Sequence, residues 1–202
     1  DRLERWYPAA ACPFPIRPPF RLLVAVVLSA QCTDAKVRQI LPTLWRTFPT
    51  PTALAAAKPR ELERLLKPLG LFREKARSLI GLARAAVAPG ITWDMPGLLA
   101  LPGVGRKTAN VVLGVLHGHA DGIAVDTHVR RISQRLGWTR SANPVVIERD
   151  LMTIVPPERR ARVTNLFIAH GRAVCRARRP DCFTCPLGDL CPSRGHWPAA
   201  TR

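Results

Sequence analysis

The sequence predicts an all-α protein, and three observations lead to that prediction. Apolar residues recur at spacings of three and four along several segments, which is the period of a helix with one buried face. No segment shows a convincing alternation of apolar and polar residues, which is the pattern of a half-buried strand. Prolines and glycines interrupt the apolar segments at short intervals, as they do where helices end. We therefore expect helices joined by turns and no sheet.

The helical period is clearest in four stretches of the chain. Each follows positions i, i+3, i+4 and i+7, so its members share one helix face. The four sets are Leu62, Leu65, Leu66 and Leu69; Ala76, Leu79, Ile80 and Ala83; Ala109, Val112, Leu113 and Leu116; and Val163, Leu166, Phe167 and His170. Ahead of them, we expect an extended strap in the segment punctuated by Pro8, Pro13, Pro15, Pro18 and Pro19.

Length and composition exclude a membrane protein. The chain has 202 residues, of which 47% are hydrophobic, so it can bury a core. Its longest apolar run, residues 22–30, is about half as long as the roughly 20 residues that a membrane-spanning helix needs. The first residues are charged and lack the apolar run of a signal peptide. We expect a cytoplasmic protein with no export or membrane signal.

The charge balance indicates a polyanionic partner. The 31 Lys and Arg residues exceed the 14 Asp and Glu residues and give a formal net charge of +17, more than solubility requires. The apolar content argues against a disordered basic tail and favours a charged folded surface, as in globular nucleic-acid-binding domains. Arginine enrichment in a genome of biased composition is the alternative. Residues 159–202 hold nine Arg and two Asp, so we expect a basic C-terminal lobe, with a boundary near Gly118 to Asp121.

A glycine turn between two helices is the first candidate binding site. It joins a short helix that starts near Asp94 to an apolar helix that ends near Leu116. Gly103 and Gly105 permit positive φ and leave no Cβ in the way of an anion. The next helix, which starts at about Arg106, adds unpaired amides and a positive dipole end. This combination suits a DNA backbone phosphate, although tight turns also use such glycines for geometry alone.

Four of the six cysteines form a second candidate site. Their spacing is C-x6-C-x2-C-x5-C, at Cys175, Cys182, Cys185 and Cys191. Thiolates this close in the chain can bind one compact metal centre, and the prolines beside them restrict the loop. From the chemistry alone, a tetrahedral zinc site and an iron-sulfur cluster both fit. Cys12 and Cys32 lie far upstream without ligand spacing, so we interpret them as buried or free thiols.

Three strings in this chain resemble the endonuclease III family of DNA glycosylases, in the order found in that family. They are Leu101-Pro102-Gly103-Val104-Gly105-Arg106-Lys107, then Val125-Asp126-Thr127-His128, and then the cysteine spacing, preceded by the similar Ala169-His170-Gly171-Arg172. The resemblance runs from about Pro19 to Cys191. It implies a two-lobe helix-hairpin-helix glycosylase fold: a six-helix barrel lobe at residues 12–120, with the hairpin at about 94–116, and an iron-sulfur cluster lobe made of residues 1–11 and 121–202.

The resemblance also implies roles for the residues of both candidate sites. Lys107 becomes the nucleophile and Asp126 the carboxylate that assists it. The cysteines of loop 175–191 become the ligands of a 4Fe-4S cluster that holds the loop in place and takes no part in catalysis. Without the resemblance, Lys107 is equally compatible with a phosphate-binding or solvent-exposed lysine, and Asp126 with a helix N-cap.

The expected contacts with DNA rest on the same resemblance. Gln31, in the string 28–34, would fill the space left by a flipped base, and Leu71, after Gly70, would slide between bases. The alternatives are a helix C-terminal turn for Gln31 and a core position for Leu71. The other expected DNA contacts are Gly103, Val104, Gly105, Arg106, His128, Arg176, Arg178 and Arg179.

The function that the resemblance implies is base excision repair by a bifunctional enzyme. It would remove oxidised pyrimidines from duplex DNA and cleave the abasic site by β-elimination through a Schiff base on Lys107. We expect a monomer whose partner is double-stranded DNA with a damaged base or an abasic site, bound between the two lobes. One alternative is a monofunctional mismatch glycosylase of the same fold, against which Lys107 argues. The other is a non-catalytic, cluster-stabilised DNA-binding module, against which Asp126 and Gln31 argue.

Overall fold

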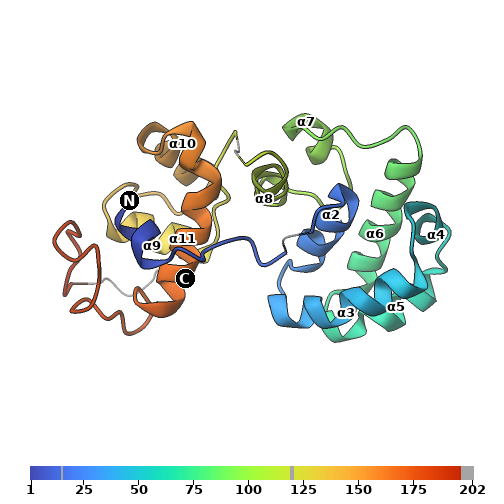
Figure 1. Cartoon of the computed structure of the whole chain (residues 1–202), viewed down its shortest axis with the longest axis horizontal. Helices are drawn as coiled ribbons and strands as arrows, with labels where there is room; N and C mark the ends of the chain where they lie inside the picture. The colour runs from blue at the N-terminus through green and yellow to red at the C-terminus, as the bar shows by residue number, and fades with distance from the viewer. Residues whose placement is uncertain (15, 119–120, 197–202) are drawn as a thin grey trace. The chain divides into compact units, whose positions relative to one another are not determined.

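The structure, a computed structural model, describes residues 1–14, 16–118 and 121–196. Within these ranges the chain forms helices, turns and loops and no strand, which confirms the predicted all-α class (Figure 1). In the same ranges, no helix combines the length and the apolar composition that a membrane crossing requires. Pro15 of the expected strap lies outside the described residues.

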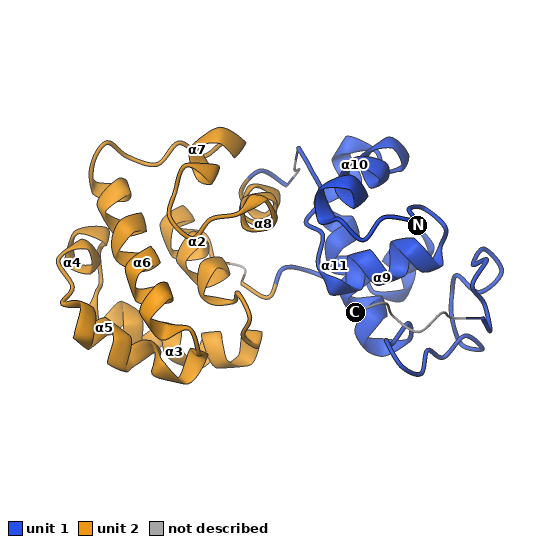
Figure 2. Cartoon of the chain, turned by 180° about the vertical axis from the view of Figure 1, so that it is seen from behind, with its two compact units in different colours: residues 1–12, 117–202 blue, residues 13–116 orange. Residues whose placement is uncertain are grey.

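The chain divides into two compact units (Figure 2). Unit 1 comprises residues 1–12 and 117–202, and unit 2 comprises residues 13–116. The first residues of the chain therefore fold with its C-terminal part, and the glycine turn at Gly103 belongs to unit 2.

Unit 2 is built on a helix that is apolar on every face over its last two turns, from Leu22 to Leu28. Helix α2 (Pro19–Leu28) has proline at its first position, where the missing N–H removes no intrahelical hydrogen bond. All its residues from Leu22 to Leu28 are buried. A helix of this composition is stable only inside a core, so the other helices of the unit must cover it.

The remaining helices of unit 2 differ in length, and three of them begin with a side-chain cap. They are α3 (Asp34–Thr47), α4 (Pro51–Ala55), α5 (Pro59–Leu66), η1 (Lys67–Leu69), α6 (Phe72–Val87), α7 (Met95–Leu99) and α8 (Arg106–His117). Oxygens of Thr33, Thr50 and Asp94 accept amide hydrogen bonds at the starts of α3, α4 and α7. Helix α6 packs against α2, α4 and α5 (Figure 1).

One predicted helix is shorter than its periodicity suggested. The apolar set runs to Leu69, but α5 ends at Leu66 and the chain continues as η1, a single turn of 3₁₀-helix. Pro68 explains the change, because it has no N–H for the next intrahelical hydrogen bond and its ring clashes with the preceding turn.

Unit 1 has its own core. Its helices are α1 (Arg2–Trp6), α9 (Thr127–Arg135), α10 (Pro144–Ile154), η2 (Pro157–Arg159) and α11 (Arg160–Ala173). Their buried side chains come together in one cluster made of Leu3, Ile123, Val129, Ile132, Ile147, Leu151, Val155, Leu166 and Phe167. The N-terminal segment is also held by Arg162 of α11, which donates to the carbonyls of Pro8 and Ala10 at 3.1 Å each.

Candidate functional site

The predicted hairpin is the turn between α7 and α8 in unit 2. Gly103 has a φ of +77°, which residues with a side chain rarely adopt, and a Cβ there would lie 2.6 Å from Ser78 Oγ on α6. Next to it, the ring of Pro102 packs against Gly81 of α6, where a Cβ would come within 2.6 Å of the ring. Because neither Gly103 nor Gly81 has a side chain, the turn can pack closely against α6 at both points.

The other side of the turn is open. A Cβ at Gly105 would meet nothing within 4 Å, and Gly105 and Arg106 are exposed while Val104 is buried. The Gly105 carbonyl accepts the first hydrogen bond of α8, from the Ala109 amide at 3.0 Å. The amides at 106–108 therefore precede the first intrahelical bond and lie at the positive end of the helix dipole. An anion that approaches Gly105 meets this end of α8 without a steric barrier.

Lys107 lies in the first turn of α8 and is exposed. The same helix buries Ala109, Val112 and Leu113, so its position is fixed by the core of unit 2 while the lysine stays accessible. Lys36, in the first turn of α3, is also exposed. Exposure in the first turn of a helix therefore does not by itself mark a lysine as functional. Lys107 differs from Lys36 because a glycine turn precedes it.

Asp126, in unit 1, is the N-cap of α9. Its Oδ1 accepts hydrogen bonds from the amides of His128 and Val129, each at 2.8 Å. The capping interpretation is thus correct, and it does not exclude catalysis. Both cap bonds fall on Oδ1 of a half-buried carboxylate, which leaves Oδ2 for another group.

His128 packs inside unit 1. Its Nδ1 lies 3.0 Å from the Arg131 guanidinium, and a Cβ on Gly171 would come within 2.4 Å of that nitrogen. Gly171 of the string 169–172 therefore makes room for His128. The expected contact of His128 with DNA stays a prediction.

Gln31 and Leu71 share an unusual backbone conformation. Among the residues that the structure describes, they are the only non-glycine residues with positive φ, at +53° and +47°. Both are exposed, and Leu71 is 47% exposed, so Leu71 is not a core residue. Gln31 lies in the turn that follows α2. Left-handed backbone at such residues is strained and is common at binding and catalytic sites.

Lys75 supports the loop that carries Leu71, a role that no motif in the sequence indicated. Its side chain is buried, and Nζ donates to the Leu69 carbonyl at 3.1 Å. Burial lowers the pKa of Lys75. The buried amine holds the chain immediately before Gly70, so the loop has a fixed starting point.

The four C-terminal cysteines line one cavity in unit 1, together with Arg135 and Gly188. All four are free thiols. Burial, reinforced by the neighbouring cysteines, raises the pKa of Cys185 and Cys191. A Cβ at Gly188 would lie 3.2 Å from the Cys185 carbonyl, a tight contact that a side chain could make only if its neighbours shifted by a few tenths of an ångström. Within the described ranges, no three His, Cys, Asp or Glu side chains are placed to hold a single metal ion.

Two arginines of α9 hold the cysteine loop. Arg135 donates to Cys175 Sγ at 3.2 Å and to the carbonyls of residues 176 and 177 at 2.8 and 3.0 Å. Arg131 donates to the Cys175 carbonyl at 3.1 Å. Our sequence analysis did not identify these residues. The available signal was a pair of arginines four positions apart, on the helix that Asp126 starts.

A buried histidine contacts the same loop. His170 is 1% exposed, with Nε2 3.6 Å from Cys185 Sγ and Nδ1 3.1 Å from the Tyr7 hydroxyl. Burial, and secondarily Arg131, lowers the pKa of His170 to about 4, so its imidazole is neutral at pH 7. The N-terminal segment thus reaches the cysteine site through Tyr7.

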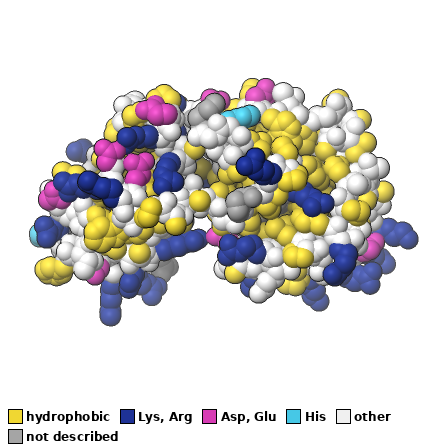
Figure 3. All heavy atoms as spheres, viewed as in Figure 1, with side chains coloured by type: hydrophobic (Ala, Val, Ile, Leu, Met, Phe, Trp, Pro, Cys, Tyr) yellow, Lys and Arg dark blue, Asp and Glu magenta, His cyan; other side chains and the backbone are white. Residues whose placement is uncertain are grey.

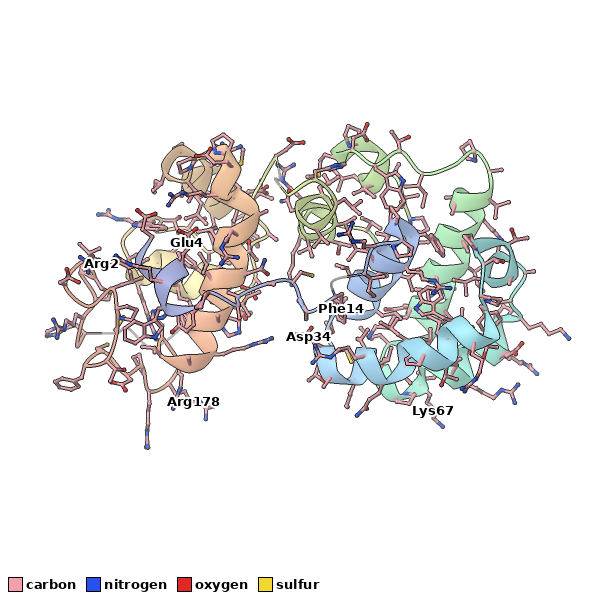
Figure 4. All side chains as sticks on the ribbon, in the orientation of Figure 1. Arg2, Glu4, Phe14, Asp34, Lys67 and Arg178 are labelled. Atoms are coloured by element: carbon pink, nitrogen blue, oxygen red, sulfur yellow. The ribbon has the colours of Figure 1, made fainter. Side chains whose placement is uncertain are left out.

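The loop that carries the cysteines is also basic. Arg176, Arg178 and Arg179 are all exposed, and Figure 4 shows Arg178 extending away from the helices of unit 1. In Figure 3, dark-blue arginine side chains gather at the lower edge of that unit, which contains no lysine. Cys12 and Cys32, outside the loop, are half-buried, and neither forms a disulfide.

Comparisons with known proteins agree on one family. A family model described as HhH-GPD superfamily base excision DNA repair protein matches residues 24–157. The endonuclease III of Synechocystis sp. is 46% identical over 194 residues, which cover 95% of this chain and 89% of the relative. A solved non-covalent endonuclease III–DNA complex is similar with a TM-score of 0.89 and 41% identity, covering 96% of this chain and 92% of the other.

A second solved structure is similar to the same extent. It is a trapped endonuclease III–DNA covalent intermediate, an estranged-adenine complex, with a TM-score of 0.88 and 42% identity, covering 96% of this chain and 93% of the other. Likeness of this identity over nearly the whole chain, together with the family model, shows that the protein belongs to the endonuclease III family of the HhH-GPD superfamily of base excision DNA repair proteins.

Proposed function

We propose that this protein excises oxidised pyrimidines from duplex DNA and cleaves the resulting abasic site, with Lys107 as the nucleophile. The observation that carries the proposal is the exposed lysine in the first turn of α8, directly after a glycine turn that is open to an anion. A relative of 42% identity has been solved as a trapped covalent intermediate with DNA, which requires a protein nucleophile. Lys107 has the residue type and the accessibility for that role.

The proposed reaction begins at C1′ of the damaged nucleotide. The base leaves with the electrons of the base–sugar bond, and the Lys107 amine forms a new bond to C1′ and passes its proton to the departing base. The sugar ring then opens: O4′ keeps the electrons of its bond to C1′ and takes a proton from water, and an iminium forms between Nζ and C1′. The hydroxide left by that water takes a proton from C2′, a C2′=C3′ double bond forms, and the 3′ phosphate leaves with the electrons of its C3′–O bond by β-elimination. Water hydrolyses the remaining imine and restores the amine.

Asp126 would stabilise the positive charge that develops at the sugar as the base leaves. Its capping hydrogen bonds support this assignment in two ways. They fix the carboxylate in one orientation, and they engage Oδ1 only, so Oδ2 can face the sugar. A side chain whose position is already fixed loses little entropy when the substrate binds.

Gln31 and Leu71 would act on the base stack. Extrusion of a base leaves a gap that a side chain must fill. A residue held at positive φ by its surroundings presents its side chain in one direction, and the strain is consistent with selection for that direction. Lys75 adds support for Leu71, because it anchors the Leu69 carbonyl two residues earlier.

The four loop cysteines would hold a 4Fe-4S cluster. The donor set fits: four free thiols share one cavity, and Gly188 leaves its wall without a side chain. Arg135 would balance the charge of the thiolates through its bond to Cys175 Sγ. The cluster would supply a rigid connection between four points of the loop. Arg176, Arg178 and Arg179 would then face DNA phosphates from a fixed backbone.

Duplex DNA with a damaged base or an abasic site would be the partner, and the enzyme would act as a monomer. The net charge of +17 and the open space beside Gly105 support DNA as the partner. A substrate of this kind places the activity at the nucleoid, in the cytoplasm.

Borohydride trapping tests the proposal. The protein is incubated with two duplexes, one carrying an oxidised pyrimidine and one carrying an abasic site, and the iminium is reduced to a stable adduct. We expect adducts on both with the native protein and with Lys36→Ala, and none with Lys107→Ala. Lys36 is the matched control because it is also exposed in the first turn of a helix. Adducts on the abasic duplex alone would contradict the proposed glycosylase activity. Adducts with Lys107→Ala would contradict the assignment of Lys107 as the nucleophile.

A further inference from the structure

Three cations form a stripe along α5 and η1 that has no role in the proposed chemistry. Arg60, Arg64 and Lys67 are spaced by four and three residues, so they lie on one helix face, and all three are exposed. The opposite face of α5 buries Leu62 and Leu66. Figure 4 shows Lys67 pointing away from the helices of unit 2. We call Arg60, Arg64 and Lys67 the α5 stripe.

No structural role accounts for the α5 stripe. In the described part of the chain, none of its side chains makes an ion pair or a side-chain hydrogen bond. Glu63 lies four positions before Lys67, a spacing that allows an ion pair, yet their charged groups are not within bonding distance. Like charges one helix turn apart repel each other and oppose helix formation. Within the described fold the stripe therefore gains no ion pair, and its only favourable local interaction is that of Arg64 with the negative end of the α5 dipole.

The stripe borders a hollow next to the Leu71 loop. The hollow measures about 540 Å³ and is lined by Arg60, Glu63, Arg64, Lys67 and Phe72. Lys67 and Phe72 lie on the two sides of Gly70 and Leu71 in the sequence, so the hollow and the loop share one border. The guanidinium of Arg73 lies 5.6 Å from the Phe72 ring and adds a fourth cation. Against these, Glu63 is the one carboxylate in the lining.

We propose that the α5 stripe binds the DNA backbone beside the base step that Leu71 enters, a contact that rests on the proposed function. A side chain inserted between bases brings the flanking phosphates to its own loop. Helix geometry gives about 10 Å between residues 60 and 67, at 1.5 Å per residue, which matches about three base steps of 3.4 Å. The two guanidinium groups suit phosphodiester oxygens, because they donate paired N–H groups. The ligand class is therefore the phosphodiester backbone of duplex DNA.

The first experiment measures how affinity depends on salt. The variant Arg60→Gln/Arg64→Gln is compared with Arg46→Gln/Arg84→Gln, which removes two exposed arginines from other helices of unit 2. The ligand is a duplex with a stable abasic-site analogue. The plot of log K against log salt has a negative slope, and each lost phosphate contact makes it shallower by about 0.9. The slope of the stripe variant should therefore be shallower than that of the native protein by about 2. Between about 50 and 200 mM salt, its affinity should fall about 12-fold less than that of the native protein.

The second experiment locates the contact. Single uncharged methylphosphonates replace successive phosphates on both sides of the abasic analogue. Native protein and the Arg46→Gln/Arg84→Gln variant should lose affinity at about two neighbouring positions that no longer matter to the stripe variant, which keeps only Lys67 of the stripe. Equal slopes for the two double variants would overturn the proposal. So would a methylphosphonate profile that the stripe variant shares with the native protein.

The two proposals fail differently. If native protein gives no borohydride adduct, the proposed function fails, whatever the salt slopes are. If native protein gives adducts but the stripe variant behaves like the control variant in both binding experiments, only the α5 stripe proposal fails.

Discussion

Asp126 combines two roles that substitution can separate. Its Oδ1 accepts the amides of both His128 and Val129, so replacement by alanine removes the N-cap of α9. Loss of such a cap costs about 1 kcal/mol of unfolding free energy, within a range of about 0.5–2. Asparagine keeps an oxygen acceptor and caps equally well, so Asp126→Asn should change the unfolding free energy by less than about 0.5 kcal/mol.

Catalysis should respond to charge instead of capping. Both Asp126→Asn and Asp126→Ala remove the carboxylate that we assign to the developing positive charge on the sugar. Loss of one preorganised electrostatic group typically lowers the rate about 10²- to 10³-fold. The single-turnover rate of release of an oxidised pyrimidine should therefore fall about 100-fold or more in both variants. Urea unfolding should distinguish them, because only Asp126→Ala loses stability.

Asn143 supplies the matched control. It is the N-cap of α10 in the same unit, and its Oδ1 accepts the Val145 amide at 2.9 Å. Asn143→Ala should lose about 1 kcal/mol of stability and keep its rate of base release. Normal turnover by Asp126→Asn would reduce Asp126 to a cap and refute the catalytic assignment. A slow Asn143→Ala variant would show that stability alone limits the measured rate.

Three further predictions concern the turn, the buried lysine and the cysteine loop. Gly103→Ala should destabilise unit 2 by about 1–3 kcal/mol, because φ is positive and Ser78 blocks the Cβ, whereas Gly105→Ala should keep the stability seen in urea unfolding but weaken binding to duplex DNA. Folding lowers the pKa of Lys75, so the unfolded chain binds more protons between that lowered value and about 10.4, and stability should rise with pH through this window. Urea titrations at a series of alkaline pH values should show a smaller rise for Lys75→Met; an equal rise would exclude Lys75 as its source. Fresh protein should absorb visible light and contain iron, and Cys191→Ser should lose both; colourless protein with one zinc ion per chain would contradict the cluster assignment.

Local chemistry explains why much of the fold could be predicted. The period of three and four residues sets the helices, because a helix with one apolar face must bury that face. Asp94 and Asp126 each stand one residue before a helix, where a short acidic side chain satisfies free amides, and both are N-caps in the structure. The glycine turn was predictable because glycine adopts positive φ without the steric cost that a side chain brings, and Gly103 has a positive φ in the structure.

Several contacts at the candidate site could not be predicted, because they join residues far apart in the sequence. Arg135 bonds to Cys175 and its neighbours 40 to 42 positions later, and Tyr7 reaches His170 across 163 positions. Whether Leu71 is a core or a surface residue also depended on tertiary structure, because a leucine after glycine is compatible with either. The α5 stripe had no motif to reveal it.

From sequence alone, the protein is identified as an all-α, strongly basic chain with a glycine turn before Lys107 and a close set of four cysteines. Each of these features depends on residue type and spacing within about 20 positions, which the chain encodes directly. Tertiary packing decides the rest: that Gln31 and Leu71 are held in strained conformations, and that Lys75 is buried behind the loop. Burial and backbone strain are imposed by neighbours from other helices, and only the folded chain brings those neighbours together.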